Sequence, residues 1–179
     1  PWLIAVAMMR WGDKSRSYSM LAQSLSLIED LPWQIILVGD GPARTEIEKA
    51  FASVAQQRVC FCGQLDPVAT ADLLTAADLF TWPAINEAFG MAILEAHRHG
   101  LPVVAGYTDG VASLVNDGQT GLLTRPPEPV VFASAIRKLL EDPDLRRRMA
   151  LSARDKFLEQ HDFDAAASRI QQFLLQVRP

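Results

Sequence analysis

One stretch of the chain decides the fold: residues 78–106, with the sequence DLFTWPAINEAFGMAILEAHRHGLPVVAG. It begins with a short apolar run at 78–82 and ends with another at 102–105, and runs of this length bounded by Gly, Pro or Asp are typical of buried strands. Between them, residues 90–99 have the periodicity of an amphipathic helix. This order predicts a parallel pair of strands, because a parallel connection requires a crossover that a helix supplies.

The same alternation of strands and helices extends over most of the chain. Further strands are expected at residues 2–8, 33–38, 58–62 and 121–124. Helices are expected at 17–29, 44–55 and 67–77 and, after the last strand, at 128–141, 143–160 and 163–177, with Asp162 as a cap of the last one. The pattern predicts one α/β domain over residues 1–179, a doubly wound, Rossmann-like six-stranded parallel sheet closed by C-terminal helices.

Composition limits the classes of partner. The 179 residues are 49% hydrophobic and carry a net charge of −4, which excludes a disordered chain and disfavours binding to nucleic acid or to anionic lipid. No apolar stretch reaches the roughly 18 residues that a membrane span needs, and no signal peptide is visible, so we expect a cytoplasmic protein. The chain lacks an initial Met and enters a strand at once, so we interpret it as a fragment whose missing part precedes Pro1.

The two cysteines do not suggest a disulfide framework. Cys60 and Cys62 lie two apart in an expected strand, where both side chains lean to one face with poor geometry for bridging each other. A reducing compartment is therefore the expected environment.

In a doubly wound sheet, ligands bind beyond the carboxyl ends of the strands, so the loops after each strand are the candidate site. Gly41, in the sequence GDGP after the second strand, allows close approach by a ligand, although a simple strand-to-helix turn explains it equally. Arg10 and Lys14 follow the first strand at the same edge. Two cations there would stabilise a diphosphate leaving group, unless they are ordinary exposed loop residues.

The segment after residue 82 contains the richest candidates. Phe89, Gly90 and Met91 are expected to offer unpaired N–H groups at the positive end of a helix, a seat for phosphate. Glu87 and Glu95 are eight residues apart, about 12 Å along a continuous helix, so they would meet two parts of one elongated ligand. Carboxylates beside a phosphate seat are suited to accept hydrogen bonds from hydroxyl groups. A ligand with hydroxyl groups at both ends and phosphate between them is a nucleotide sugar.

Other readings of these residues stay open. Eight glutamates in this chain give such a spacing often by chance, so both carboxylates can also be solvent-facing helix residues. His97 and His99 lie two apart on a helix, hence on different faces, which argues against shared metal ligation, and no zinc, calcium or Walker pattern is present.

Five motifs in series resemble one known family. They are VGDGPAR, RVCFCGQLD, AADLFTWPAINEAFGMAILEAHRHGLPVVAG, GVASLVNDGQTGLLT and EDPDLRRRMALSARDKF. Together they resemble the C-terminal, donor-binding domain of the retaining glycosyltransferases of family 4, which are two-domain enzymes of the GT-B fold. The likeness covers nearly the whole chain.

The resemblance implies a role for each candidate residue. Glu95 would hold the ribose hydroxyls, Glu87 would touch hydroxyls of the transferred sugar, and Lys14 would bind the diphosphate. Main-chain groups of Phe89, Gly90 and Met91 would contact sugar and phosphate, and Gly41 would lie in the loop after the second strand. The stretch around Cys62 to Gln64, which includes Gly63, would lie near the base.

The chain departs from the family pattern at two places. The family has an arginine five or six residues before the diphosphate lysine, where this chain has Met8 and Met9, and Arg10 stands only four before it. Ala88 replaces the glycine that commonly follows the first glutamate, a change that ordinary backbone angles would tolerate.

The resemblance therefore predicts a retaining hexosyltransferase that needs no metal or other cofactor and takes a nucleotide diphosphate sugar as donor. An N-terminal domain of the same protein would supply the acceptor site and any membrane contact, and without it the isolated domain is expected to be inactive. Two alternatives remain, namely half of a nucleotide-sugar epimerase and a non-catalytic α/β module that binds nucleotides or regulates.

Overall fold

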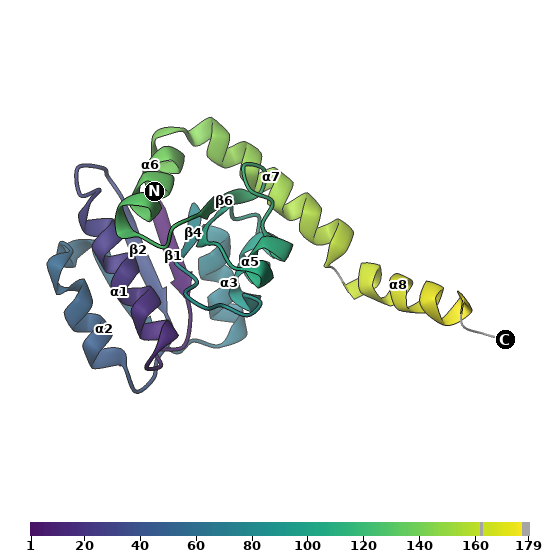
Figure 1. Cartoon of the computed structure of the whole chain (residues 1–179), viewed down its shortest axis with the longest axis horizontal. Helices are drawn as coiled ribbons and strands as arrows, with labels where there is room; N and C mark the ends of the chain where they lie inside the picture. The colour runs from purple at the N-terminus through teal and green to yellow at the C-terminus, as the bar shows by residue number, and fades with distance from the viewer. Residues whose placement is uncertain (162, 177–179) are drawn as a thin grey trace.

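The structure, a computed structural model, describes residues 1–161 and 163–176 (Figure 1). Its centre is one sheet of six parallel strands, which confirms the predicted doubly wound sheet. The strand order, which the sequence analysis left open, is β3-β2-β1-β4-β5-β6. The strands are β1 (Trp2–Val6), β2 (Gln34–Val38), β3 (Val59–Gly63), β4 (Leu79–Trp82), β5 (Val103–Gly106) and β6 (Gly121–Thr124). The order reverses at β1, which lies between β2 and β4.

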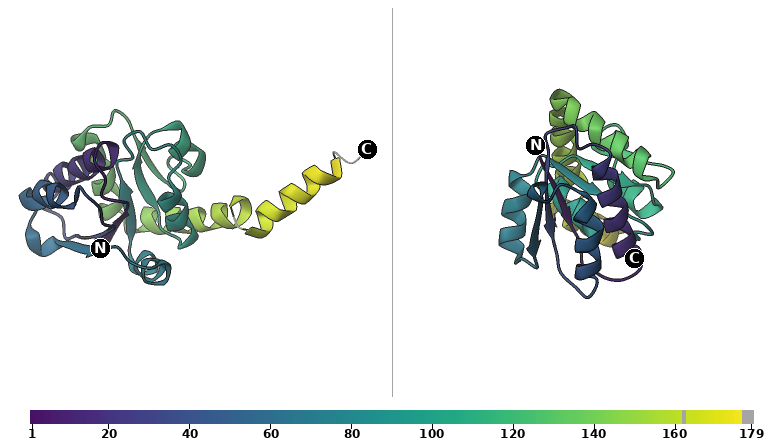
Figure 2. Two further views of the ribbon diagram at one scale, coloured as in Figure 1. Left: turned by 90° about the horizontal axis from the view of Figure 1, so that it is seen from below. Right: turned by 90° about the vertical axis from the view of Figure 1, so that its left-hand side faces the viewer.

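Helices cover both faces of the sheet (Figures 1 and 2). On one face α1 (Asp13–Ser26) packs against α2 (Arg44–Ala50) and α6 (Pro129–Glu141). On the other face α4 (Met91–Arg98) packs against α3 (Pro67–Ala76), α5 (Asp109–Leu114) and α7 (Pro143–Gln160). The last helix, α8 (Phe163–Gln176), extends from α7 away from the sheet. Asp162 and residue 177, which the sequence assigns to this helix, lie outside the described residues.

The core explains why the central strands are apolar runs rather than alternating ones. All four residues of β4 and of β5 are buried, and so are Leu3, Ile4 and Ala5 of β1. Strands of a parallel sheet with helices on both faces have no solvent side, so every position is available for core packing. The polar loops are left at the ends of the strands.

Most elements differ from the sequence prediction by one to three residues at an end, and two helices differ by more. The helix predicted to end at residue 55 ends at Ala50 and gives way to two 3₁₀ turns, Phe51–Ser53 and Gln56–Arg58. Phe51 turns inward against Phe61 of β3, and the Gln56 amide donates to the Phe51 carbonyl. The first helix begins earlier than predicted, at Asp13.

Close contact between neighbouring loops shapes the carboxyl edge of the sheet. A Cβ on Gly39 would lie 2.0 Å from the carbonyl oxygen of Ala7, and one on Gly106 would lie 1.8 Å from that of Pro83. These glycines therefore let the loops after β1 and β4 press backbone to backbone against the adjacent strands. The loops that could hold a ligand are thus held by main-chain packing.

We expect Gly106→Ala to lower the free energy of unfolding by at least about 2 kcal/mol, because the new methyl group would overlap a carbonyl group that cannot move independently. Urea unfolding followed by circular dichroism measures this loss. Gly118→Ala is the matched control, since its Cβ meets nothing within 4 Å and only its φ of 76° is unfavourable. This control should lose about 1 kcal/mol, and equal losses in the two variants would contradict the overlap.

Candidate functional site

A cavity of about 240 Å³ lies where the strand order reverses, between the loop after β1 and the loop after β4. Crevices at such reversal points are the usual ligand sites of open α/β sheets. The residues that line it are Met8, Arg10, Trp11, Asp13, Lys14, Ile85, Asn86 and Glu87. Three residues singled out from the sequence, Arg10, Lys14 and Glu87, therefore share one cavity.

An ion pair joins the two sides of this cavity. Lys14 donates from Nζ to Oε2 of Glu87, across 73 residues of sequence, and the same oxygen lies 3.3 Å from the indole nitrogen of Trp82. The Lys14 ammonium also lies 5.3 Å from the centre of the Trp82 ring, a cation–π distance. The side chains are 30% and 18% exposed, so both charges remain open to a ligand in the cavity.

Helix α1 fixes this arrangement through residues on one of its faces. Lys14, Ser17 and Tyr18 lie three or four positions apart, which places them on one side of a helix. Ser17 Oγ accepts a hydrogen bond of 3.0 Å from the Ile85 N–H, and Tyr18 packs edge-on against Trp82 while its hydroxyl donates to the Ala7 carbonyl. One helix face thus holds the loops after both strands.

Lys14 lies in the first turn of α1, not in the loop that the sequence predicts. The N–H groups of that turn form the positive end of the helix, where a cation is unfavourable and an anion is attracted. Glu87 offsets the charge of Lys14 in the structure. A bound diphosphate would meet both the ammonium and the helix end.

The loop from β4 to α4 has an unusual backbone. Ala84 and Asn86 have φ values of 55° and 51°, which non-glycine residues seldom adopt and which tend to occur at functional sites. Thr108 Oγ1 donates to the Glu87 carbonyl at 2.8 Å and so fixes the loop from the side of β5. Ala88 has no positive φ, so its replacement of a glycine is tolerated as expected.

Helix α4 begins at Met91, with Gly90 as N-cap at a φ of 94°. The Gly90 carbonyl accepts from the N–H groups of Ile93 and Leu94, so the N–H groups that precede them point out of the first turn. The side chains of Phe89 and Met91 are exposed on either side of this helix end. The helix end at which the sequence predicts an anion seat thus lies next to Glu87, and the binding of an anion there stays a prediction.

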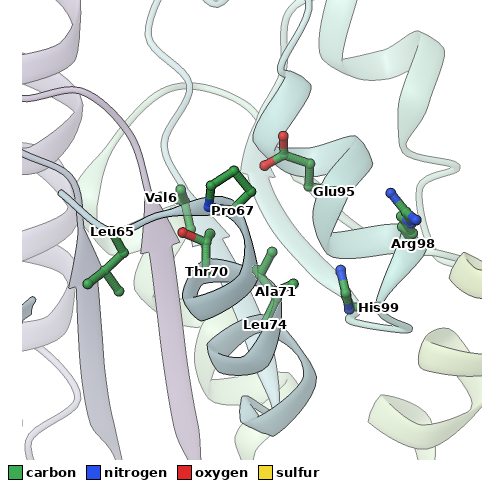
Figure 3. A pocket seen from close by; sticks show the side chains of 9 residues that line it. All are labelled: Val6, Leu65, Pro67, Thr70, Ala71, Leu74, Glu95, Arg98 and His99. Atoms are coloured by element: carbon green, nitrogen blue, oxygen red, sulfur yellow. The ribbon is translucent and has the colours of Figure 1, made fainter.

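A second cavity, of about 350 Å³, lies between α3 and α4 and contains Glu95 (Figure 3). Its other lining residues are Val6, Leu65, Pro67, Thr70, Ala71, Leu74, Arg98 and His99. Val6 ends β1, and Met8, two residues later, lines the smaller cavity. The two cavities therefore flank the carboxyl end of the same strand.

Glu87 and Glu95 do not lie on one continuous helix. Glu87 belongs to the loop before α4, whereas Glu95 lies in its second turn. The condition of an uninterrupted helix, on which the separation of about 12 Å was calculated, is therefore not met, because the backbone leaves helical geometry at Asn86 and Gly90. The two carboxylates line separate cavities, and the end of α4 lies between them in the sequence.

The two remaining predicted glycines lie at the neighbouring strand ends. A Cβ on Gly41 would lie 2.5 Å from the Met9 carbonyl oxygen, so only glycine lets the two loops pack this closely. The strand-to-helix turn is therefore a sufficient reason for a glycine at this position. Gly63 ends β3, and its carbonyl accepts from the Gly39 N–H at 2.8 Å. Neither lines the two cavities described above.

The arginine side chain that the family pattern places earlier is replaced by a different arrangement. Met9 is fully buried and Met8 is exposed at the cavity, while Arg10 is exposed and lines it. Asp13 lies on the same wall, where the Arg16 guanidinium holds the pKa of its carboxyl below the usual value. Arg10 is thus the second cation of the cavity, after Lys14.

Sequence reasoning missed several residues that build the site. Ser17, Tyr18 and Thr108 make its supporting contacts, and Trp82 was assigned only to a strand. Lys14, Ser17 and Tyr18 have the spacing of one helix face. This spacing could have identified Ser17 and Tyr18 if the helix had been predicted to begin at Asp13. No pattern in the sequence predicts the hydrogen bond from Thr108 to the Glu87 carbonyl, because the two residues are 21 positions apart.

The described part of the chain has neither a cluster of metal ligands nor a membrane-spanning helix. No group of three or more His, Cys, Asp or Glu side chains there could hold a metal ion. Among its helices, none is long and apolar enough to cross a membrane.

The sequence matches the family Glycosyl transferases group 1 over residues 12–156. The chain therefore belongs to this family and has the C-terminal type of domain found in GT-B glycosyltransferases. The members of this family are transferases. The match therefore does not favour the two alternative functions, half of a nucleotide-sugar epimerase or a non-catalytic module.

Individual relatives agree with the family match. Alpha-D-kanosaminyltransferase of Streptomyces kanamyceticus is 33% identical over 138 residues, which are 76% of this chain and 36% of that protein. Sulfoquinovosyl transferase SQD2 of Arabidopsis thaliana is 31% identical over 149 residues, 81% of this chain and 28% of the relative. The chain thus spans about a third of the length of these relatives.

Solved structures share the fold over almost the whole chain. Sucrose-phosphate synthase of Thermosynechococcus elongatus has a TM-score of 0.85 at 26% identity, covering 99% of this chain and 45% of that one. HepE of Anabaena, solved in complex with UDP-glucose, has a TM-score of 0.81 at 25% identity, covering 98% and 49%. The six-stranded parallel sheet is therefore that of a GT-B glycosyltransferase.

The ion pair at the cavity should contribute measurably to stability. We expect a double-mutant cycle of Lys14→Ala and Glu87→Ala to give a coupling energy of about 1 kcal/mol in low salt, falling in 1 M salt, because the pair is partly shielded from water. Urea unfolding of the four proteins measures it. Arg147 and Asp144 form the control pair, since both side chains are largely exposed. Equal coupling in the two pairs would contradict a special environment at the cavity.

Proposed function

We propose that this chain is the donor-binding domain of a family 4 retaining glycosyltransferase, which binds a nucleotide diphosphate sugar. The observation that carries the proposal is the contact of Lys14 with Glu87 beside the free end of α4, at the reversal of strand order. A cation, a carboxylate and a helix end in one place suit a ligand with phosphate next to hydroxyl groups.

The proposed donor lies across the carboxyl end of β1. Its diphosphate is bound by Lys14 and by the N–H groups at Gly90 and Met91, with Arg10 as a further cation. Its sugar occupies the smaller cavity, where the Glu87 carboxylate accepts hydrogen bonds from hydroxyl groups. Its ribose reaches Glu95 in the larger cavity, and its base lies toward Gly63.

Lys14 is well placed to exchange one partner for another. In the structure its ammonium is paired with Glu87, but it has three N–H donors. The Lys14 ammonium can therefore donate to a diphosphate oxygen and to Glu87 at the same time. Neither the ammonium nor the carboxylate then loses its partner. Positive charge at Lys14, Arg10 and α4 would stabilise the departing diphosphate, so we propose transfer without a metal ion.

Group transfer in this proposal breaks the bond from the anomeric carbon to the diphosphate oxygen and forms one to an acceptor hydroxyl, with the configuration kept. The acceptor side belongs to a further domain, which is consistent with relatives about two to three times as long as this chain. The chain alone should therefore bind donor weakly and transfer nothing.

UDP is the first ligand to test, because HepE, a structural relative, was solved with UDP-glucose. We expect Lys14→Ala to weaken binding of UDP by about 1.5 to 3 kcal/mol through the loss of a charge-assisted contact, and to leave binding of uridine nearly unchanged. Isothermal titration calorimetry with UDP and with uridine measures both affinities, and titrations with GDP and ADP identify the preferred base. Lys138→Ala, on the exposed side of α6, is the control. Equal losses for nucleoside and diphosphate would contradict the role of Lys14.

The role of Glu95 can be tested separately from the phosphates. If its carboxylate accepts from the ribose hydroxyls, the wild-type chain should bind UDP more tightly than 2′,3′-dideoxy-UDP by about 1.5 kcal/mol or more, and Glu95→Gln should reduce that preference. Competition binding measures the four affinities. A preference that survives in the variant would remove Glu95 from the proposed site.

A further inference from the structure

The two cysteines of the chain lie side by side on the edge of the sheet. Cys60 and Cys62 both belong to β3, and their sulfur atoms are 3.6 Å apart. The sequence contains no other cysteine, so any disulfide within one chain must join these two residues. Neither lines the two cavities described above, although Cys62 directly precedes Gly63, toward which the base is proposed to lie.

Their geometry is close to that of a bridge. Two residues along a strand place Cα atoms about 6.6 Å apart, just inside the upper limit for disulfides. Sequence reasoning judged this spacing poor for bridging. The structure shows that both side chains nevertheless converge, with the two sulfurs in contact at 3.6 Å.

The backbone at Cys62 is less constrained than that of a regular strand. The register of β3 against β2 pairs Leu37 with Phe61 and then Val38 with Gly63, so Cys62 has no partner in the ladder. Such a bulge leaves one residue unpaired and bends the strand. The strand can therefore adjust at Cys62 when the sulfurs approach.

Both thiols are accessible to a small reagent, but unequally. β3 is an edge strand that pairs only with β2, and on it Cys60 is exposed while Cys62 is half-buried. Burial, together with the neighbouring Cys60, raises the pKa of the Cys62 thiol to about 11. Cys60 is expected to react first because it is the exposed thiol, whereas Cys62 is half-buried and its raised pKa disfavours the reactive thiolate.

We propose that Cys60 and Cys62 form a reversible disulfide, and that this pair is a redox-modification site that reacts with low-molecular-weight disulfides of the glutathione type. The proposal is independent of the glycosyltransferase function. It rests on the contact between the two sulfurs, their exposure on the edge strand and the bulge at Cys62.

The reaction proceeds in two exchanges. The Cys60 thiolate attacks one sulfur of glutathione disulfide, breaks its S–S bond and releases one glutathione thiolate, which takes up a proton. Cys62 then loses its proton to water, and its thiolate attacks Cys60 Sγ and releases the second glutathione. In total, two protein thiols lose two electrons and two protons, and one glutathione disulfide is reduced to two thiols.

The bridge should be easy to reduce. A disulfide near the limit of its span is strained, and strained, exposed disulfides have the more oxidising potentials of labile bonds. It should therefore form in an oxidising glutathione buffer and open in a reducing one. Among the described residues, no third His, Cys, Asp or Glu side chain lies where it would complete a metal site with this pair.

The experiment uses the full chain in glutathione buffers of increasing oxidised fraction, with a chelator present. After quenching with iodoacetamide, mass spectrometry of the intact chain and of its peptides identifies each cysteine as alkylated, glutathionylated or bridged. The wild-type chain should gain a species that carries neither alkyl nor glutathione groups and is two hydrogens lighter. Dithiothreitol should restore two alkylatable thiols.

Two single variants make the result decisive, and serine keeps the size and polarity of each site. Cys62→Ser removes the second exchange, so it should accumulate the glutathione adduct at Cys60 by at least about tenfold over the wild type. Cys60→Ser should form less adduct, since Cys62 is half-buried. Glutathione adducts on both cysteines of the wild type, or disulfide-linked dimers in place of the light monomer, would overturn the proposal.

Discussion

The docking of α1 against the end of β4 is the constraint on which the carboxyl edge of the sheet depends. Within two turns of one helix, Lys14 meets Glu87, Ser17 binds the Ile85 amide and Tyr18 packs against Trp82. Residues from distant parts of the sequence are thereby held in one cavity. Because strand order reverses at β1, the loops after β1 and β4 leave an opening there that helices do not fill.

The electrostatics of this cavity differ from those of the whole chain. The chain carries a net charge of −4, yet Arg10, Lys14 and two helix ends gather at the reversal point. Glu87 compensates Lys14 while no ligand is bound. The proposed donor would therefore replace or share an existing charge contact. Its selectivity would depend on how its phosphate and hydroxyl groups fit the ammonium and the carboxylate together.

Much of the architecture was predictable because buried parallel strands and amphipathic helices leave strong local patterns. All six strands and seven of the helices were placed, with shifts of a few residues at most ends. The six-residue helix α5 was missed, since so short a helix containing Gly110 has little local signal and is stabilised by packing. The early end of α2 was also missed. It depends on the packing of Phe51 against Phe61, a tertiary contact that leaves no local pattern.

The sequence by itself determined the order of strands and helices, the edge at which the site lies and the residue types that serve it, because these follow from periodicity and from the rules of parallel connections. Only the tertiary structure decided that Lys14 touches Glu87, that Glu95 faces a separate cavity and that the two cysteine sulfurs meet. Such contacts depend on where each helix begins, on positive φ angles in one loop and on a bulge in one strand. These features arise from packing between distant segments and have no local pattern in the sequence.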